Sequence, residues 1–358
     1  MLRRAFLARS YVFGICSVTF PFDAGAQQVG KVYRIGVLLL TTAAETAEEM
    51  GVFRQALREL GWVNKRAITF EERWADGHYE RLPAFAAELV ALKVEVIFTA
   101  GTPGVQAAMK ATRVIPIVFW SAGDPVGQKM VQSLAHPGGN VTGFSRLDAE
   151  RTTRGPTVLK EAVPGIKRVA FFWNGANPAT AHFLPIAQAA YQSIGIQLEN
   201  FDIRSSDDVE ETFEKISRAD VQFLILQADD MLVLHLKQIG ELALKHRIPL
   251  LASEAGPGVL LVSRPEHLAM IRGAAGYVDK ILKGANPGGL PVQQPTKFEL
   301  IINLKTAKAL GLTIPQSLVL RASEVIQQPS ARALKRTSAY SLPGTIRQGL
   351  EWRVCLGL

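Results

Sequence analysis

Arg34-Ile35-Gly36-Val37 opens the body of this chain, and a similar stretch, Arg168-Val169-Ala170-Phe171, follows 134 residues later. Two more stretches recur at nearly the same offset: Leu60-Gly61-Trp62 as Ile194-Gly195-Ile196, and Ile115-Pro116-Ile117-Val118 as Ile248-Pro249-Leu250-Leu251. Each similarity is weak alone, since glycine is a common residue at helix C-termini. Together they indicate an internal duplication, because they keep a common register.

Short apolar runs alternate with amphipathic stretches through the same part of the chain. The candidate strands are 33–40, 68–74, 94–100, 115–120, 169–173, 196–203, 223–227 and 250–252. The candidate helices are 47–60, 82–92, 105–111, 181–193, 209–216 and 232–246. This alternation favours parallel sheets with helical crossovers over a mixed α+β fold. The sequence therefore predicts an α/β chain with two doubly wound parallel-sheet lobes.

We expect an N-terminal lobe over residues 30–145 and a C-terminal lobe over residues 146–262, with residues 263–327 completing both. Open parallel sheets bind ligands beyond the carboxyl ends of their strands. Two such edges facing each other form a cleft that closes by rotation at hinge crossovers between the lobes. The glycines of residues 139–143 suit such a crossover.

The N-terminal residues have the order of a secretory signal peptide. Arg3 and Arg4 precede a mainly apolar stretch over residues 5–22, and Ala24-Gly25-Ala26 supplies small residues for cleavage. Three polar residues interrupt the apolar stretch, which disfavours a membrane-spanning helix. We expect cleavage near Ala26 and a soluble periplasmic product. The paired arginines leave both the general and the twin-arginine export routes open.

The formal net charge of +8 is concentrated at the two ends. Residues 1–26 carry +2 and residues 330–358 carry +4, which leaves +2 for the body of the chain. A nucleic-acid-binding domain has its basic residues on the fold itself, so no nucleic-acid partner is expected. Residues 328–358 are expected to form a basic, disordered tail.

Several motifs, in order, resemble one known family. They are Gly101-Thr102-Pro103, Gly123-Asp124-Pro125-Val126-Gly127, the Pro-Gly-Gly-Asn-Val-Thr-Gly run at 137–143, the segment 277–284 and the segment 295–300. Over about residues 30–327 the chain resembles the ABC transporter substrate-binding family, which has a type I periplasmic-binding-protein fold. Residues 253–264 depart from the family pattern.

The resemblance implies a periplasmic solute-binding protein that delivers a small organic ligand to an ABC permease in the inner membrane. An amino-acid-like ligand is favoured, because characterised members of the family bind aromatic amino acids. No cofactor is expected, and the protein is expected to be a monomer. The alternative function is a ligand-sensing receptor domain for a signalling partner, and the altered segment 253–264 favours it.

In the first lobe, polar residues at strand ends are candidate ligand contacts. Free backbone N–H groups at helix N-termini favour ligand carboxylates. The candidates are Thr41, Thr42, Gly101, Thr102, Ser121 and Asp124. A threonine here either binds a ligand carboxylate or caps its own helix, and Asp124 either pairs with a ligand ammonium or caps the helix beginning near Pro125.

In the second lobe the candidates follow the same rule. They are Asn174, Asn177, Asp229, Asp230, Ser253 and Glu254, with Phe144 and Ser145 beside the expected crossover. Of the two adjacent aspartates, one is expected to cap the following helix. Glu254 is an alternative partner for a ligand ammonium.

The sequence lacks the patterns of common enzymes. The six histidines form no H-x-x-x-H pair, and neither a Gly-x-Ser-x-Gly elbow nor a Gly-Lys-Ser/Thr phosphate loop occurs. We therefore expect no catalytic residues and no metal site.

Overall fold

The computed structural model describes residues 31–62, 67–146 and 148–327. The expected signal peptide, residues 1–26, and the expected tail, residues 328–358, lie outside the described residues. Within the described ranges, no helix combines the length and apolar character needed to cross a membrane.

The first lobe is built on a five-stranded sheet whose neighbouring strands are all parallel. Its order is β2-β1-β3-β4-β5, with β1 at Tyr33–Leu39, β2 at Ile68–Trp74, β3 at Val96–Thr99, β4 at Ile117–Ala122 and β5 at Val141–Ser145. Residues 35–39 are buried throughout, as a parallel strand covered on both faces requires. The strand order reverses between β1 and β3, which is where doubly wound sheets bind ligands.

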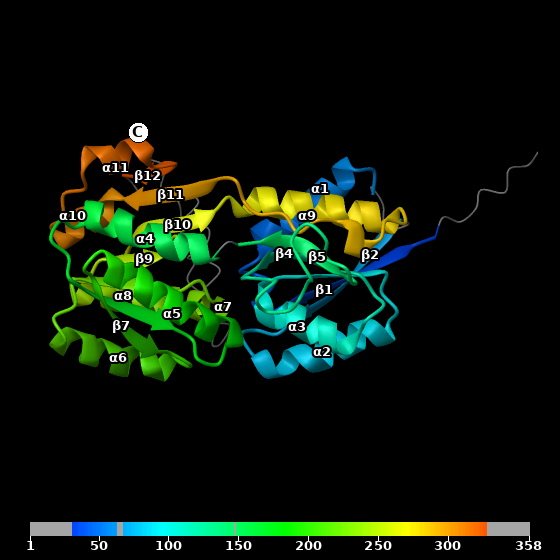
Figure 1. Cartoon of the computed structure of the whole chain (residues 1–358), viewed down its shortest axis with the longest axis horizontal. Coiled ribbons are helices and arrows are strands. Elements are labelled where there is room, and N and C mark those ends of the chain that lie inside the picture. Colours follow the sequence, from blue (N-terminus) through cyan, green and yellow to red (C-terminus); the bar gives the residue numbers. More distant parts are fainter. Residues whose placement is uncertain (1–30, 63–66, 147, 328–358) are drawn as a thin grey trace, which may run out of the picture. The chain divides into compact units, whose positions relative to one another are not determined.

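Helices cover both faces of this sheet. They are α1 (Ala47–Glu59), the 3-10 turn η1 (Tyr79–Arg81), α2 (Leu82–Ala91), α3 (Gly101–Ala111) and α9 (His267–Leu282). Helices α1 and α9 pack on one face, and α2 and α3 pack on the other (Figure 1). Phe53 of α1 stacks on Phe98 of β3 with ring centroids 3.8 Å apart.

The second lobe is built on a seven-stranded sheet of order β12-β11-β10-β9-β8-β6-β7. The strands are β6 (Arg168–Trp173), β7 (Gln197–Asp202), β8 (Phe223–Leu226), β9 (Leu250–Ala252), β10 (Val259–Pro265), β11 (Phe298–Asn303) and β12 (Glu324–Ile326). Strand β11 is antiparallel to β10, and the other pairs are parallel.

This sheet is also covered on both faces. The helices are α4 (Asp148–Ala162), α5 (Pro178–Ser193), α6 (Ser206–Arg218), α7 (Asp230–Leu234), α8 (Leu236–Lys245), α10 (Leu304–Leu310) and α11 (Gln316–Arg321). Residues of α4, α5, α10 and α11 share one apolar core with the sheet. Residues of α6, α7 and α8 share the other.

The predicted fold class is confirmed, and the duplication extends to topology. Counted from its own first strand, each lobe contains the order 2-1-3-4-5, since β7-β6-β8-β9-β10 matches β2-β1-β3-β4-β5. The repeated stretches at Arg34 and Arg168 lie in β1 and at the start of β6. Gly61 and Gly195, which end the matching helices, both have positive φ, at 99° and 77°.

The chain crosses between the lobes at strand ends rather than at residues 139–143. It passes from β5 to α4, returns after β10 to form α9, and crosses again from the turn η2 (Pro287–Gly289) to β11. Gly143 lies inside β5 with φ of 151°, and a Cβ there would collide with the backbone of Phe119 in β4. This glycine therefore permits the close approach of two strands.

Candidate functional site

A cavity of about 120 Å³ lies between the carboxyl ends of strands from the two sheets. One water molecule needs about 10–15 Å³ of such space, so the cavity is large enough for a small organic molecule. From the first lobe it is lined by Leu39, Leu40, Thr41, Glu45, Thr46, Glu49, Ala100, Gly101, Trp120, Ser121, Arg146, His267 and Met270. From the second lobe it is lined by Ala228, Asp229, Asp230, Val233, Ser253, Glu254, Arg264 and Pro265.

The loop after β1 places a carboxylate in the cavity wall. Glu45 Oε2 accepts hydrogen bonds from the backbone N–H and the hydroxyl of Thr42, both at 3.0 Å. Burial raises the pKa of Glu45, the bonds from Thr42 oppose that rise, and the nearby Asp76 adds to it. Thr42 thus orients Glu45, while Thr41 faces the cavity.

The two adjacent aspartates of the second lobe have different roles. Asp229 caps α7, because its Oδ1 accepts from the backbone N–H groups of Met231 at 3.1 Å and Leu232 at 3.3 Å. Its carboxylate also accepts hydrogen bonds from Tyr79, Asn174 and Asn177. These contacts leave Asp229 as a structural anchor at the cavity edge.

Asp230, by contrast, faces the first lobe. A Cβ added to Gly101 would lie 3.0 Å from Asp230 Oδ2, so the absence of a side chain on Gly101 makes room for the carboxylate. Burial raises the pKa of Asp230 to about 6, Arg146 opposes the rise, and Asp229, Glu45 and Glu254 add to it. A cation bound here would favour the ionised form.

The N-terminus of α3 presents polar groups beside Asp230. Its N-cap residue is Ala100, and no side chain caps the helix. Thr102 is 2 % exposed, and its hydroxyl makes no hydrogen bond to any described residue, so it does not cap α3. Together with the free N–H groups of the first helical turn, this hydroxyl can bind a carboxylate.

Arginines from both lobes reach the same region. Arg146 follows β5, and its Nη2 lies 3.5 Å from the carbonyl oxygen of Ala228. Arg264 of β10 pairs with Glu254 and, through its Nε at 2.8 Å, with Glu299. Glu254 is therefore held by Arg264 on the cavity wall, next to Ser253.

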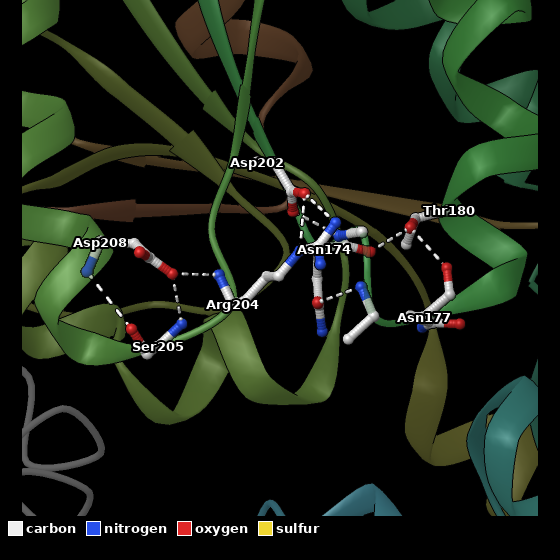
Figure 2. Close-up of polar contacts among 9 residues, drawn as sticks. Asn174, Asn177, Thr180, Asp202, Arg204, Ser205 and Asp208 are labelled. Atoms are coloured by element: carbon white, nitrogen blue, oxygen red, sulfur yellow. Dashed lines mark hydrogen bonds and ion pairs between the residues drawn. The ribbon is translucent and has the colours of Figure 1, made fainter.

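Asn174 and Asn177 support the site from a loop of the second lobe (Figure 2). Asn174 Nδ2 donates to Asp229 Oδ1 at 3.0 Å, and Asn177 Nδ2 donates to Asp229 Oδ2 at 2.7 Å. The Thr180 hydroxyl bonds to the carbonyl oxygens of both asparagines, and Asp202 accepts from the Gly175 N–H at 2.6 Å (Figure 2). These bonds fix the loop and, through it, the Asp229 carboxylate.

Seven of the predicted residues lie outside the cavity wall: Thr42, Thr102, Asn174 and Asn177, described above, and Asp124, Phe144 and Ser145. Asp124 Oδ1 accepts from the Gly127 N–H at 2.9 Å in a local turn. Phe144 packs in the core, with its ring against Gly273 and 5.4 Å from the Tyr277 ring. Ser145 is buried, and its backbone N–H donates to the carbonyl oxygen of Gln293 at 2.8 Å.

Several cavity residues were not predicted from the sequence: Glu45, Glu49, Arg146, Arg264, His267 and Met270. Arg146 directly follows β5, which was not among the predicted strands, so the expectation of ligand contacts at strand ends could not identify it. Glu45 lies in the turn before α1 and Glu49 in the first turn of that helix, so both lie close to the end of β1. Among the described residues, no group of three or more His, Cys, Asp or Glu is arranged to hold a metal ion.

Two duplicated α/β lobes, with a cavity between the carboxyl ends of strands from both sheets, define a solute-binding protein of the periplasmic-binding-protein type. The chain belongs to the family of ABC transporter substrate binding proteins, whose pattern matches residues 34–326. The predicted solute-binding function is thereby confirmed, and the family favours transport over the sensing alternative. It is a family of solute-binding proteins, not of enzymes.

Similar proteins agree with this assignment. A tyrosine-binding protein from Clostridioides difficile is 26% identical over 287 residues, which cover 79% of this chain and 82% of that protein. The crystal structure of a conserved domain protein from Vibrio cholerae has 26% identity and a TM-score of 0.77, and covers 82% of this chain and 100% of that one. A domain from Streptococcus pneumoniae in complex with L-Trp has 22% identity and a TM-score of 0.76, covers 83% of this chain and 100% of that one, and shares the fold.

Proposed function

We propose that this protein binds an α-amino acid as a zwitterion between its lobes. The observation that carries the proposal is that Asp230, Gly101 and Arg146 line both the cavity and a small hollow beside it, which Thr102 also lines. Asp230 lies against Gly101, at the uncapped N-terminus of α3 that also carries the Thr102 hydroxyl. An α-amino acid bears its ammonium and its carboxylate on the same carbon. A site for a cation next to a site for an anion therefore suits it.

In this proposal the ligand carboxylate binds the N–H groups of the first turn of α3, the Thr102 hydroxyl and Arg146. The ligand ammonium pairs with Asp230, and Glu45 and Glu254 add to the negative potential. Thr41, Ser121 and Ser253 supply further hydrogen-bonding groups on the wall. The name of the tyrosine-binding relative supports an amino acid as the ligand class.

The protein is further proposed to work as a monomer in the periplasm. In this proposal its signal peptide is cleaved near Ala26, and the loaded protein delivers its ligand to an ABC permease of the inner membrane. Mass spectrometry of the mature protein from the periplasmic fraction would test this, because it gives the new N-terminus directly. Recovery of the intact chain from the cytoplasm would contradict it.

Isothermal titration with matched ligands tests the zwitterion proposal. We expect saturable binding of one or more α-amino acids, and weaker binding of the corresponding amine, which lacks the carboxylate, and of the acid that lacks the ammonium. Each missing charge should weaken binding by at least about tenfold, since hydrogen bonds to charged groups contribute about 1.5–3 kcal/mol. Sugar binding with no response to any amino acid would overturn the proposal.

A further inference from the structure

His267 is a further polar residue of the same cavity wall, outside the set assigned to the zwitterion. His267, the first residue of α9, places both ring nitrogens in a buried position where neither makes a hydrogen bond to a described residue. Its Nε2 lies 3.4 Å from Glu49 Oε1, and the two side chains are only 12% and 9% exposed. Buried polar atoms in native proteins have partners, so these nitrogens require an explanation.

His267 stands at the start of a helix that packs on the first lobe. Its helix is held on the first lobe by an apolar face that includes Met270, Ile271 and Ala274. Apolar side chains, namely Leu39, Trp120, Pro265 and Met270, line the same cavity. The imidazole is thus a buried hydrogen-bonding group in a cavity wall that also contains apolar side chains.

The charge of the pair restricts what it can bind. When His267 is protonated, its charge is balanced by Glu49, and when His267 is neutral, it offers one donor and one acceptor nitrogen. A charged ligand group gains little binding free energy from the His267–Glu49 pair when the two opposite charges of that pair cancel. A hydroxyl both donates and accepts, so it matches the imidazole in either tautomer.

We propose that His267 selects a ligand whose large apolar side chain carries a hydroxyl, as in a hydroxylated aromatic amino acid. The inference rests on the proposed function, because the zwitterion contacts place the backbone end of the ligand near Asp230. The hydroxyl then takes the hydrogen bond that the protein leaves unmade at His267. A ligand that lacks the hydroxyl would leave the ring nitrogens of His267 buried without a hydrogen bond. A site built to bind a hydroxyl discriminates strongly against ligands that lack one.

Titration of the wild-type protein with L-tyrosine and L-phenylalanine is the first test. We expect tyrosine to bind at least about tenfold more tightly, because a buried polar group left unpaired costs about 1–3 kcal/mol. Equal affinities, or tighter binding of phenylalanine, would overturn the assignment of His267 while leaving the zwitterion proposal intact. Failure of every amino acid to bind would instead remove the proposed function itself.

Two variants assign the preference to this side chain. His267→Leu should lower the tyrosine-to-phenylalanine affinity ratio to near one, chiefly through weaker tyrosine binding, whereas His267→Gln should keep part of it. His136→Leu, at an exposed histidine outside the cavity wall, is the matched control and should keep the wild-type ratio. A ratio unchanged in His267→Leu would contradict the proposal.

Discussion

At the scale of single residues, Asp230 should make the ligand-free protein less stable as the pH rises. Its pKa, about 6 in the folded protein, lies above the value of about 4 expected in the unfolded chain. The folded state therefore binds more protons between these values, and its stability falls as the pH rises from about 4 through 6. Asp230→Asn should remove this loss and raise the unfolding free energy at pH 7 by about 1–3 kcal/mol.

The same substitution should weaken amino-acid binding, because the ligand ammonium loses its ionised partner. Affinity in the wild type should also fall below about pH 6, where Asp230 becomes protonated. Urea unfolding at pH 5 and pH 7, together with titration calorimetry, measures both effects. Glu241→Gln on the exposed surface of α8 is the control and should change neither. A variant that is less stable at pH 7 yet binds normally would contradict this role.

The expectation that ligand contacts follow the ends of parallel strands predicted part of the cavity wall from the sequence. It identified Thr41, Gly101, Ser121, Asp229, Asp230, Ser253 and Glu254, all of which line the cavity. It could not distinguish the capping role of Asp229 from the cavity-facing position of Asp230, because either residue can precede a helix. It also missed Glu49 and His267, which reach the cavity only because α1 and α9 pack together on the first sheet.

At the scale of elements, the packing of α9 on β5 can be tested with two glycines of one helix. A Cβ at Gly273 would collide with the Phe144 ring, whereas nothing lies within 4 Å of a Cβ at Gly276. Gly273→Ala should destabilise the protein by about 1–3 kcal/mol through overpacking. Gly276→Ala should stabilise it by about 0.5–1 kcal/mol, because alanine is the better helix former.

Urea unfolding of both variants gives the comparison directly. Equal effects of the two substitutions would show that α9 does not pack closely on Phe144. This contact also explains why the sequence could not place Phe144. An aromatic residue after a glycine-rich segment suits a cleft as well as a core, and the partner that decides the matter is 129 residues away in the chain.

At the scale of the whole molecule, the duplicated sequence was sufficient to predict two parallel lobes. The repeated stretches fall in corresponding elements, and both sheets have the same order around their switch points. The fifth strand of each repeat, β5 and β10, was not predicted, and neither were β11 and β12, which complete the second sheet after the repeats have ended. The assignment of α9 to the first lobe likewise depends on contacts between distant segments.

A hydrogen-bonded contact between the lobes should contribute to ligand affinity without touching the ligand. The Tyr79 hydroxyl, from η1 in the first lobe, donates to Asp229 Oδ2 at 3.0 Å and accepts from Asn174 Nδ2 at 2.9 Å. Burial and the nearby carboxylates raise the pKa of Tyr79, so its hydroxyl stays protonated as a donor. Rotation of the lobes away from each other must break both bonds.

Tyr79→Phe should therefore favour separated lobes and weaken ligand binding by about three- to tenfold, since such bonds contribute about 0.5–1.5 kcal/mol. The loss should appear mainly as faster ligand dissociation in stopped-flow measurements, because the bonds hold the lobes together around the bound ligand. Tyr277→Phe is the matched control: its hydroxyl bonds to the carbonyl oxygen of Pro291 within the first lobe. If both variants released ligand at the wild-type rate, Tyr79 would be a local packing residue, and closure would depend on the ligand alone.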